Sequence, residues 1–298
     1  MIKLERLSDK PVVSPDLSQP WERAATFNTA AIYDNGLFHL LYRATDIGCH
    51  ARFGDYMNSI GYAVSCDGIH FMKLDKPVLA PGNHPQELRG AEDGRLVKIG
   101  DTFHLTYTGF SNRFDGDYRI CMATSKNLIT WERRGVVLDE PNKNASLFPE
   151  KVSGKWCLLH RRHPDIWIAW SDDMQNWHGH TKILSPVSDT WQDARVGIAG
   201  PPIKTPQGWF LMYHAAHLAD NSYRLGAALL DLADPTKVLA RQAEPIIEPE
   251  LAWEKVGFVP NVIFSNGHAV KGNEIYVYYG GADTVIGVAA MRMSDIRF

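Results

Sequence analysis

The sequence lacks any apolar run approaching the roughly 20 residues that a membrane-spanning helix needs. The first residues, MIKLERLSDKP, also lack the apolar core of a signal peptide. A formal net charge of −3 gives no electrostatic reason to expect a nucleic acid or an anionic membrane as partner. We therefore expect a cytoplasmic protein with no membrane and no nucleic-acid partner.

Cysteine is scarce, with four residues at Cys49, Cys66, Cys121 and Cys157. They show no CxxC spacing and are too few for a disulfide scaffold, so we expect buried free thiols. No HExxH or similar spacing predicts a metal site, and no GxxxxGK pattern predicts a bound nucleotide. We expect neither metal nor cofactor.

The chain does contain a repeat. A short apolar strand with aromatic residues recurs at 37–44, 103–110, 155–163, 208–217 and 274–283, each time between two other candidate strands. A polar turn after Ser65, Ser125 or Ser171 closes the first three repeats. Antiparallel sheets in series fit an all-β five-bladed propeller better than a sandwich, because radially arranged blades protect their edges. We expect residues 1–298 to form a single catalytic propeller, with its largest loop insertion at 46–58.

One strand of this repeat opens with two adjacent acids, Glu92 and Asp93, although Asp is depleted from strand interiors. The first strand of each blade lines the axis of a propeller, so Asp93 is expected to point into a central funnel beside Asn28, where the active site would lie. The alternative is that the acid pair caps a surface turn.

Axial carboxylates suggest sugar chemistry, in which two acids normally share the work. A second acid is hard to find, because Asn28 and Thr29 stand where a base would be expected and an amide cannot take a proton from water. The other candidate funnel residues are cationic or hydrogen-bonding: Arg43, Arg95, Arg113, Lys151, Arg161 and His214. Inorganic phosphate is already anionic and needs no base. These residues therefore suggest phosphorolysis, with phosphate as a free substrate.

Nine segments of the chain, including FNTAAIY, GAEDGRL, NASLFPEK, GIAGPPIK and YVYYGGADTVIGVA, resemble glycoside hydrolase family 130, the β-mannoside phosphorylases and related mannosidases. The resemblance implies a five-bladed propeller that converts a β-mannoside and phosphate into α-mannose 1-phosphate with inversion. It makes Asp93 the catalytic acid, acting by way of the mannose 3-hydroxyl. Gly94 stands where the family usually has proline, so we expect a looser presentation of Asp93.

The same resemblance assigns binding roles. For phosphate it implies Arg43, Lys151 and His214, with Arg113 and Arg161 as further candidates; for the sugar it implies Asn28, Arg95, Asp165 and Asp283. Each has a structural alternative. Arg43 and Arg161 could pair with surface acids, Lys151 could be a solvated loop residue, His214 a core histidine, and Asp283 a turn cap.

The segments GIAGPPIK and LHRRHPDIWIAWSDD are most similar to the branch acting on β-1,2-linked mannooligosaccharides. We therefore expect an inverting β-mannoside phosphorylase with a β-mannooligosaccharide and phosphate as its partners. The alternatives are a phosphorylase of β-1,4-mannooligosaccharides or mannosyl-glucose, an inverting β-mannosidase, and a non-catalytic carbohydrate-binding propeller. Exposed loop aromatics are compatible with a homo-oligomer.

Overall fold

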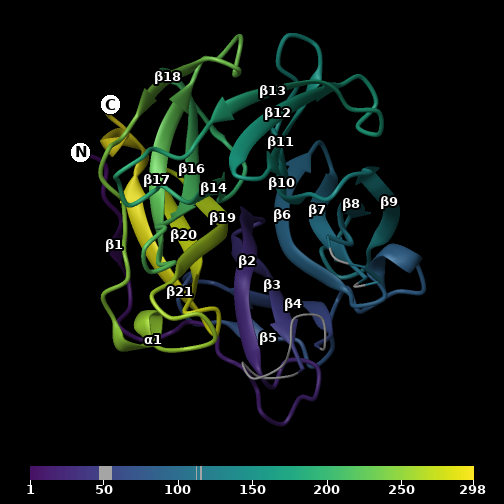
Figure 1. The fold of residues 1–298 in the computed structure, drawn as a ribbon. Helices are drawn as coiled ribbons and strands as arrows, with labels where there is room; N and C mark the ends of the chain where they lie inside the picture. Colours follow the sequence, from purple (N-terminus) through teal and green to yellow (C-terminus); the bar gives the residue numbers. More distant parts are fainter. Residues whose placement is uncertain (47–55, 112, 115) are drawn as a thin grey trace.

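The computed structural model describes residues 1–46, 56–111, 113–114 and 116–298, and it arranges them as five antiparallel sheets in a ring (Figure 1). The prediction of an all-β five-bladed propeller is confirmed. Most of the insertion expected at 46–58 lies outside the described residues.

Each sheet is one blade, built from strands that follow one another in the chain. Blades one to three contain β2 (Ala25–Asp34), β3 (Leu37–Thr45), β4 (Asn58–Ser65) and β5 (Met72–Lys73); β6 (Ala91–Ile99), β7 (Thr102–Phe110), β8 (Tyr118–Ser125) and β9 (Glu132–Leu138); and β10 (Lys143–Leu147), β11 (Trp156–Arg162), β12 (Asp165–Ser171) and β13 (His178–Leu184). Blade four contains β14 (Arg195–Ile198), β15 (Ile203–Thr205), β16 (Gly208–Ala216), β17 (Tyr223–Leu230) and β18 (Val238–Arg241). Blade five contains β19 (Ile263–Lys271), β20 (Glu274–Gly281), β21 (Val285–Arg292) and β1 (Glu5–Arg6). The helical segments are short: η1 (Pro85–Glu87), α1 (Ala252–Lys255) and η2 (Met293–Asp295).

The first strands of the blades surround the axis. Strand β2 lies against both β19 and β6, and β10 lies against β6 and β14. Apolar side chains fill the spaces between blades instead: five buried clusters each join two consecutive blades around the ring. Because both faces of a blade are buried, its middle strands read as apolar and aromatic runs. This packing leaves the axis to polar side chains.

The repeated serine turns hold the outer edge of the first three blades. The hydroxyl oxygen of Ser65 accepts hydrogen bonds from the backbone amides of Asp67 (3.2 Å) and Gly68 (2.9 Å). Ser125 and Ser171 accept the corresponding amides in blades two and three. These bonds stabilise the tight link to the fourth strand, so the turn seen in the sequence is a structural repeat.

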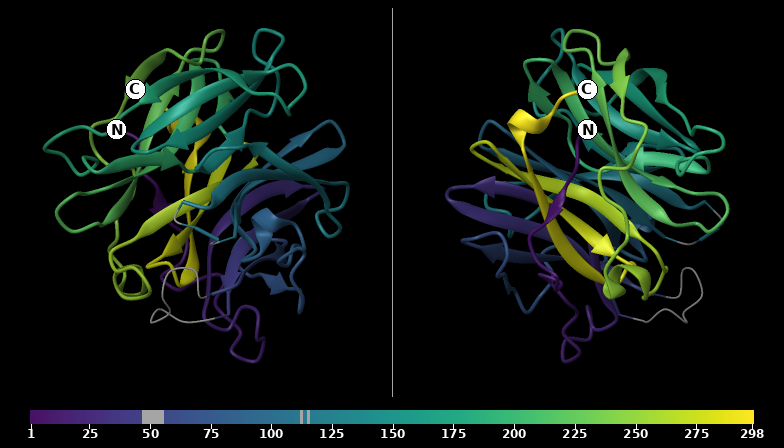
Figure 2. Two further views of the ribbon diagram at one scale, coloured as in Figure 1. Left: turned by 45° about the vertical axis from the view of Figure 1, so that its right-hand side comes forward. Right: turned by 90° about the vertical axis from the view of Figure 1, so that its left-hand side faces the viewer.

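The ring is closed by the N-terminal segment. Glu5 and Arg6 of β1 pair with Ala290 and Ala289 of β21, and the Arg6 guanidinium forms an ion pair with the buried Glu254 at 2.8 Å. The two ends of the chain consequently lie close together in both views of Figure 2. A strand from the start of the chain thus covers the edge that blade five would otherwise expose.

Within the described residues no helix has both the length and the apolar character to cross a bilayer. Cys121 and Cys157 are buried free thiols, as expected. The prediction is wrong for Cys66, which is exposed because it lies in the polar turn directly after β4. Cys49 lies outside the described residues.

Candidate active site

Three inner strands carry a β-bulge at the same end. The pairing register shifts between Phe27 and Ala30 in β2, between Glu92 and Arg95 in β6, and between Lys143 and Ser146 in β10. Within these bulges Asn28, Asp93 and Asn144 have φ values of 46°, 51° and 59°. Asn and Asp adopt this left-handed region more readily than most residues, and a bulge re-aims a side chain. Each bulge therefore turns a polar side chain toward the axis of the propeller.

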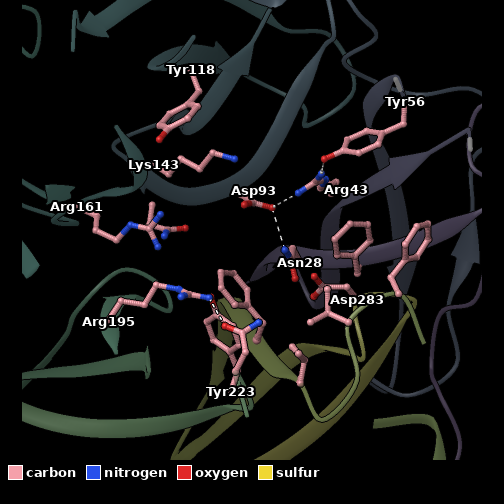
Figure 3. A pocket seen from close by; sticks show the side chains of 17 residues that line it. Asn28, Arg43, Tyr56, Asp93, Tyr118, Lys143, Arg161, Arg195, Tyr223 and Asp283 are labelled. Carbon is pink, nitrogen blue, oxygen red and sulfur yellow. Dashed lines mark hydrogen bonds and ion pairs between the residues drawn. The ribbon is translucent and has the colours of Figure 1, made fainter. Parts of the chain in front are cut away.

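The bulges border a cavity of about 490 Å³ on the axis (Figure 3). All five blades contribute to its walls. Its polar lining includes Asn28, Arg43, Asp93, Lys143, Asn144, Arg161, Arg195 and Asp283, and its aromatic lining includes Phe27, Tyr56, Tyr118, Tyr223, Phe258 and Phe264. The structure thus brings together five residues that the sequence predicted: Asn28, Arg43, Asp93, Arg161 and Asp283.

Asp93 lies in the middle of the cavity lining and is held from several sides. Its Oδ1 accepts hydrogen bonds from Asn28 Nδ2 (3.0 Å) and Arg43 Nη1 (3.2 Å), and its backbone carbonyl accepts one from Arg95 Nη1 (2.7 Å). Burial raises the pKa of this carboxyl, but Arg43, Arg95 and Lys143 outweigh it and hold the pKa below its ordinary value. Asp93 is therefore ionised at neutral pH.

Gly94 follows Asp93 in the bulged strand. A Cβ atom there would meet Leu105 Cδ1 at 2.8 Å, so the glycine lets this leucine pack beneath the bulge. The contacts that hold Asp93 come from Asn28, Arg43 and Arg95. The expectation that Gly94 loosens Asp93 stays a prediction.

Glu92 points away from the cavity. It is fully buried, and its Oε1 accepts hydrogen bonds from Asn58 Nδ2 (2.9 Å) and Arg43 Nη2 (3.1 Å). Its Oε2 accepts one from Lys143 Nζ at 3.1 Å. The acid pair is thus neither a surface turn nor two axial acids, because alternate side chains of the strand leave on opposite sides.

One end of the cavity offers unsatisfied acceptors. Asp283 follows β20 with a φ of 51°, and burial raises its pKa to about 7, against the lowering effect of Arg43 and with a further rise from Asp93. Within the described residues, Asp283 Oδ1 and Asn28 Oδ1 are buried and have no hydrogen-bond partner. Buried polar atoms are normally paired, so this end fits a ligand that carries hydroxyl donors.

The other end is cationic. Arg161 and Arg195 come from blades three and four and point toward the centre, opposite Asn28 and Asp283 (Figure 3). Burial lowers the pKa of Arg161, whose guanidinium makes no hydrogen bond or ion pair with any described residue. Arg195 donates from Nε to Tyr223 Oη (2.6 Å) and from Nη2 to Asn221 Oδ1 (2.5 Å), which fixes its direction. Two guanidinium groups in a fixed cluster fit an anion with several oxygens.

The sequence reasoning missed Lys143, Asn144, Arg195 and Tyr223 as cavity residues. Lys143 and Asn144 occupy in blade three the place that Glu92 and Asp93 occupy in blade two. The signal that would have found them is an Asn or Asp near the start of the inner strand in each of blades one to three. Arg195 lies at the start of the short β14, where no such marker is present.

Three predicted site residues do not line the cavity, so the expected place of Lys151 and Arg113 in the funnel is wrong. Lys151 is exposed beyond the far end of β10, with its ammonium 5.2 Å from the Trp156 ring centre. Arg113 is ion-paired with Asp117 at 2.8 Å in a loop. Asp165 begins β12 and lies 3.8 Å from Lys182. The physical reason for Lys151 is that β10 runs away from the cavity, so only its first residues reach the site.

Two more predicted residues, His214 and Arg95, lie one layer behind the cavity wall. His214 stacks on Phe264 with ring centres 3.8 Å apart, and burial together with nearby arginines holds its pKa well below the ordinary value. Arg95 donates to Asn144 Oδ1 (2.9 Å) and to the Ile198 carbonyl (2.7 Å), and burial lowers its pKa to about 9. Neither residue lines the cavity: the lowered pKa makes His214 neutral behind Phe264, and Arg95 holds the two bulges through Asp93 and Asn144. Their roles in binding a ligand stay predictions.

Metal-ligating side chains do not gather in the described parts of the chain, since no group of three or more His, Cys, Asp or Glu residues could hold an ion. What the arrangement can do is bind a polyhydroxylated molecule next to an anion, with a carboxyl group between them.

Comparison with known proteins gives a consistent result. Residues 4–297 match the sequence model of the family Glyco_hydro_130, described as beta-1,4-mannooligosaccharide phosphorylase. The chain is 68% identical over 298 residues to the 1,2-beta-oligomannan phosphorylase of Thermoanaerobacter sp. (strain X514), and the alignment covers all of both chains. It is 52% identical over 304 residues, again covering both chains completely, to the beta-1,2-mannobiose phosphorylase of the same organism.

A solved structure shows the same fold. The beta-1,2-mannobiose phosphorylase from Listeria innocua, in complex with beta-1,2-mannobiose, superposes with a TM-score of 0.89 at 31% identity. The superposition covers 98% of each chain.

Proposed function

The chain belongs to glycoside hydrolase family 130, and from this membership and the cavity geometry we propose that it catalyses the phosphorolysis of β-1,2-linked mannosides by inorganic phosphate. The observation that carries the proposal is the different chemistry of the two ends of the cavity. Unpaired acceptors of Asn28 and Asp283 lie at one end, arginines lie at the other, and Asp93 lies between them.

In this reaction the mannose unit occupies the end of Asn28 and Asp283, where its hydroxyls satisfy the two free oxygens. Phosphate lies among Lys143, Arg161 and Arg195. A phosphate oxygen attacks the anomeric carbon from the face opposite the leaving oxygen, and the glycosidic bond breaks. The leaving oxygen receives a proton from the mannose 3-hydroxyl, which in turn takes one from Asp93. The products are α-mannose 1-phosphate and the shortened mannoside, and no cofactor takes part.

Asp93 must hold a proton when the bond breaks, yet the cations around it favour its ionised form. A bound phosphate brings negative charge to the cations that hold the pKa of Asp93 down. Because a nearby negative charge disfavours ionisation, phosphate raises the pKa of Asp93 and favours proton uptake. Phosphate is then both the nucleophile and the ligand that prepares the acid.

The arrangement also supports phosphorolysis over hydrolysis. A hydrolase needs a carboxylate that activates water on the face opposite the leaving oxygen. Among the described residues that line the cavity the carboxyl groups are Asp93, the proposed acid, and Asp283, which lies at the sugar end away from the arginines. The names of the two highly identical relatives support the β-1,2 linkage over the β-1,4 linkage in the family description. A cytoplasmic location and a homo-oligomeric state stay predictions.

Product analysis tests the proposal. The purified protein is incubated with β-1,2-mannobiose with and without phosphate, and products are identified by phosphorus and proton NMR. We expect α-mannose 1-phosphate and mannose in equal amounts, only when phosphate is present. Release of mannose without phosphate would make the protein a mannosidase, and no release would make it a binding protein. Faster reaction with β-1,4-mannobiose would overturn the linkage.

A further inference from the structure

Glu92 connects the two halves of the cavity without touching it. Its carboxylate is fully buried and does not line the cavity. It accepts from Arg43 (3.1 Å) on the side of Asn28, and from Lys143 (3.1 Å) on the cationic side. One buried anion thus holds two cations that belong to different blades.

Arg43 is shared between the adjacent acids. Its Nη2 donates to Glu92 and its Nη1 donates to Asp93 (3.2 Å). Its Nε donates to Asn58 Oδ1 (2.9 Å), and Asn58 Nδ2 donates back to Glu92 (2.9 Å). These bonds close a ring of Arg43, Glu92 and Asn58. Arg43 is therefore engaged at three nitrogens, which leaves the phosphate to Lys143 and the other arginines.

We propose that Glu92 is a positioning residue that fixes Arg43 and Lys143 and limits their combined attraction for the Asp93 carboxylate, so that Asp93 can take up the proton used in the reaction. The inference rests on the proposed role of Asp93 as the acid. It adds to that role a second carboxylate, which contacts no substrate and acts through two cations.

The charges around Asp93 explain why Glu92 matters. The charged or titratable groups that face Asp93 are Arg43, Arg95, Lys143, Arg161, Asp283 and the adjacent Glu92. Cations outnumber anions in this set. When Glu92 loses its charge, Arg43 keeps Asp93 as its remaining hydrogen-bonded carboxylate, and the Lys143 ammonium loses its ion pair with Glu92. Asp93 then stays ionised to a lower pH.

The test compares Glu92→Gln with Glu87→Gln. Glu87 is a matched control because it is as buried as Glu92, lies in η1 beside the same blade, and accepts from Tyr107 Oη and Arg133 Nε, both at 2.7 Å, away from the cavity. The measurement is the pH profile of phosphorolysis at saturating sugar and phosphate, with the fold checked by circular dichroism. We expect E92Q to move the alkaline limb down by about one pH unit, with roughly tenfold lower kcat at neutral pH. E87Q should leave the limb in place.

The variant Glu92→Asp tests the charge of residue 92 separately from the length of its side chain. It keeps the negative charge but is one methylene shorter, so it cannot hold both cations. We expect its alkaline limb to stay near that of the wild type while the KM for phosphate rises about tenfold, the effect of one lost charge-assisted hydrogen bond. If E92Q does not fold, E92D still tests the positioning role of Glu92.

Two results would overturn the inference: an unchanged alkaline limb in folded E92Q, or an equal shift in E87Q. A wild-type phosphate KM in E92D would remove the positioning role of Glu92. These outcomes differ from a failure of the proposed function, which would appear in the wild-type protein as phosphate-independent release or no release at all.

Discussion

The two ends of the same inner strands have different chemistry. At the cavity end β2, β6 and β10 are bulged, with Asn or Asp in the left-handed region. At the opposite end pairing is regular, and a second hollow of about 270 Å³ is lined mainly by apolar side chains and prolines. The lysines there are already paired, Lys98 with Asp34 (2.7 Å) and Lys204 with Glu150 (2.5 Å).

This contrast shows what distinguishes a site from a scaffold in this fold. A bulge costs a ladder hydrogen bond and a left-handed residue costs backbone energy. Bulges that contain a left-handed residue recur at the cavity end, whereas the described pairing of β2 and β6 toward the opposite end has no register shift. We therefore expect changes at the cavity end to affect the reaction, and changes at the far end to affect stability only.

The largest effect is expected from a comparison of the two ends of β6. Asp93→Asn removes the proton donor and should lower kcat about 10²–10⁴-fold, which is the usual contribution of general acid catalysis. Asp101→Asn, at the exposed turn where β6 ends, is the control and should retain wild-type activity. Both variants are compared by the initial rate of phosphate release from mannose 1-phosphate in the presence of an acceptor sugar. Near-normal activity in a folded D93N protein would refute the role of Asp93.

The next effect compares two cations of blade three, of which the sequence reasoning favoured Lys151 over Arg161 for phosphate binding. Arg161→Ala should raise the KM for phosphate about ten- to hundredfold with a much smaller change for the sugar, because a charge-assisted hydrogen bond contributes about 1.5–3 kcal/mol. Lys151→Ala should change neither constant. If K151A weakened phosphate binding and R161A did not, the anion site would have to move to the far end of β10.

A smaller effect concerns the pH dependence of the wild-type protein. The alkaline limb of kcat/KM for phosphate reports Asp93 without phosphate, and that of kcat reports it with phosphate bound. Since phosphate raises the pKa of Asp93, the alkaline limb of kcat should lie about half a pH unit to one unit higher than that of kcat/KM. The profile of kcat/KM is first corrected for the known ionisation of free phosphate. Coincident limbs would mean that phosphate does not act on Asp93.

The smallest effect is on stability and contrasts two aspartates in left-handed conformations. Asp283 is half-buried, with its Oδ1 covered, and Asp189 is exposed; their φ values are 51° and 60°. The pKa of Asp283 is about 7 in the folded state, so the native state holds a proton that the unfolded state releases near pH 4, and stability falls as the pH rises through this window. Asp283→Asn should raise Tm by about 2–4 °C at pH 8 and hardly at all at pH 4.

Asp189→Asn should leave Tm unchanged at both pH values. Differential scanning calorimetry of the two variants measures the difference. A rise in Tm of D283N that is equal at both pH values would show that charge burial is not its cause.

The sequence predicted the fold well because the repeated strand pattern and the serine turns are local signals. It predicted Asp93 and Asn28 because a polar residue in an inner strand is locally unfavourable and so needs a reason. It failed for Lys151, because the periodicity of blade three does not say which end of β10 carries the bulge. It failed for His214 because burial behind Phe264 is a property of the packed ring.

The closure of the ring by β1 also bears on when, during synthesis, the cavity can be completed. Residues 5–6 leave the ribosome early but have to wait for residues 289–290 before they can pair. Blades one to four can form in order during synthesis, since domains and repeats emerge N-terminal end first. Asp283, just before β21, and Phe264 of β19 both belong to the last blade of the ring. A nascent chain that has not yet reached blade five therefore carries an incomplete cavity.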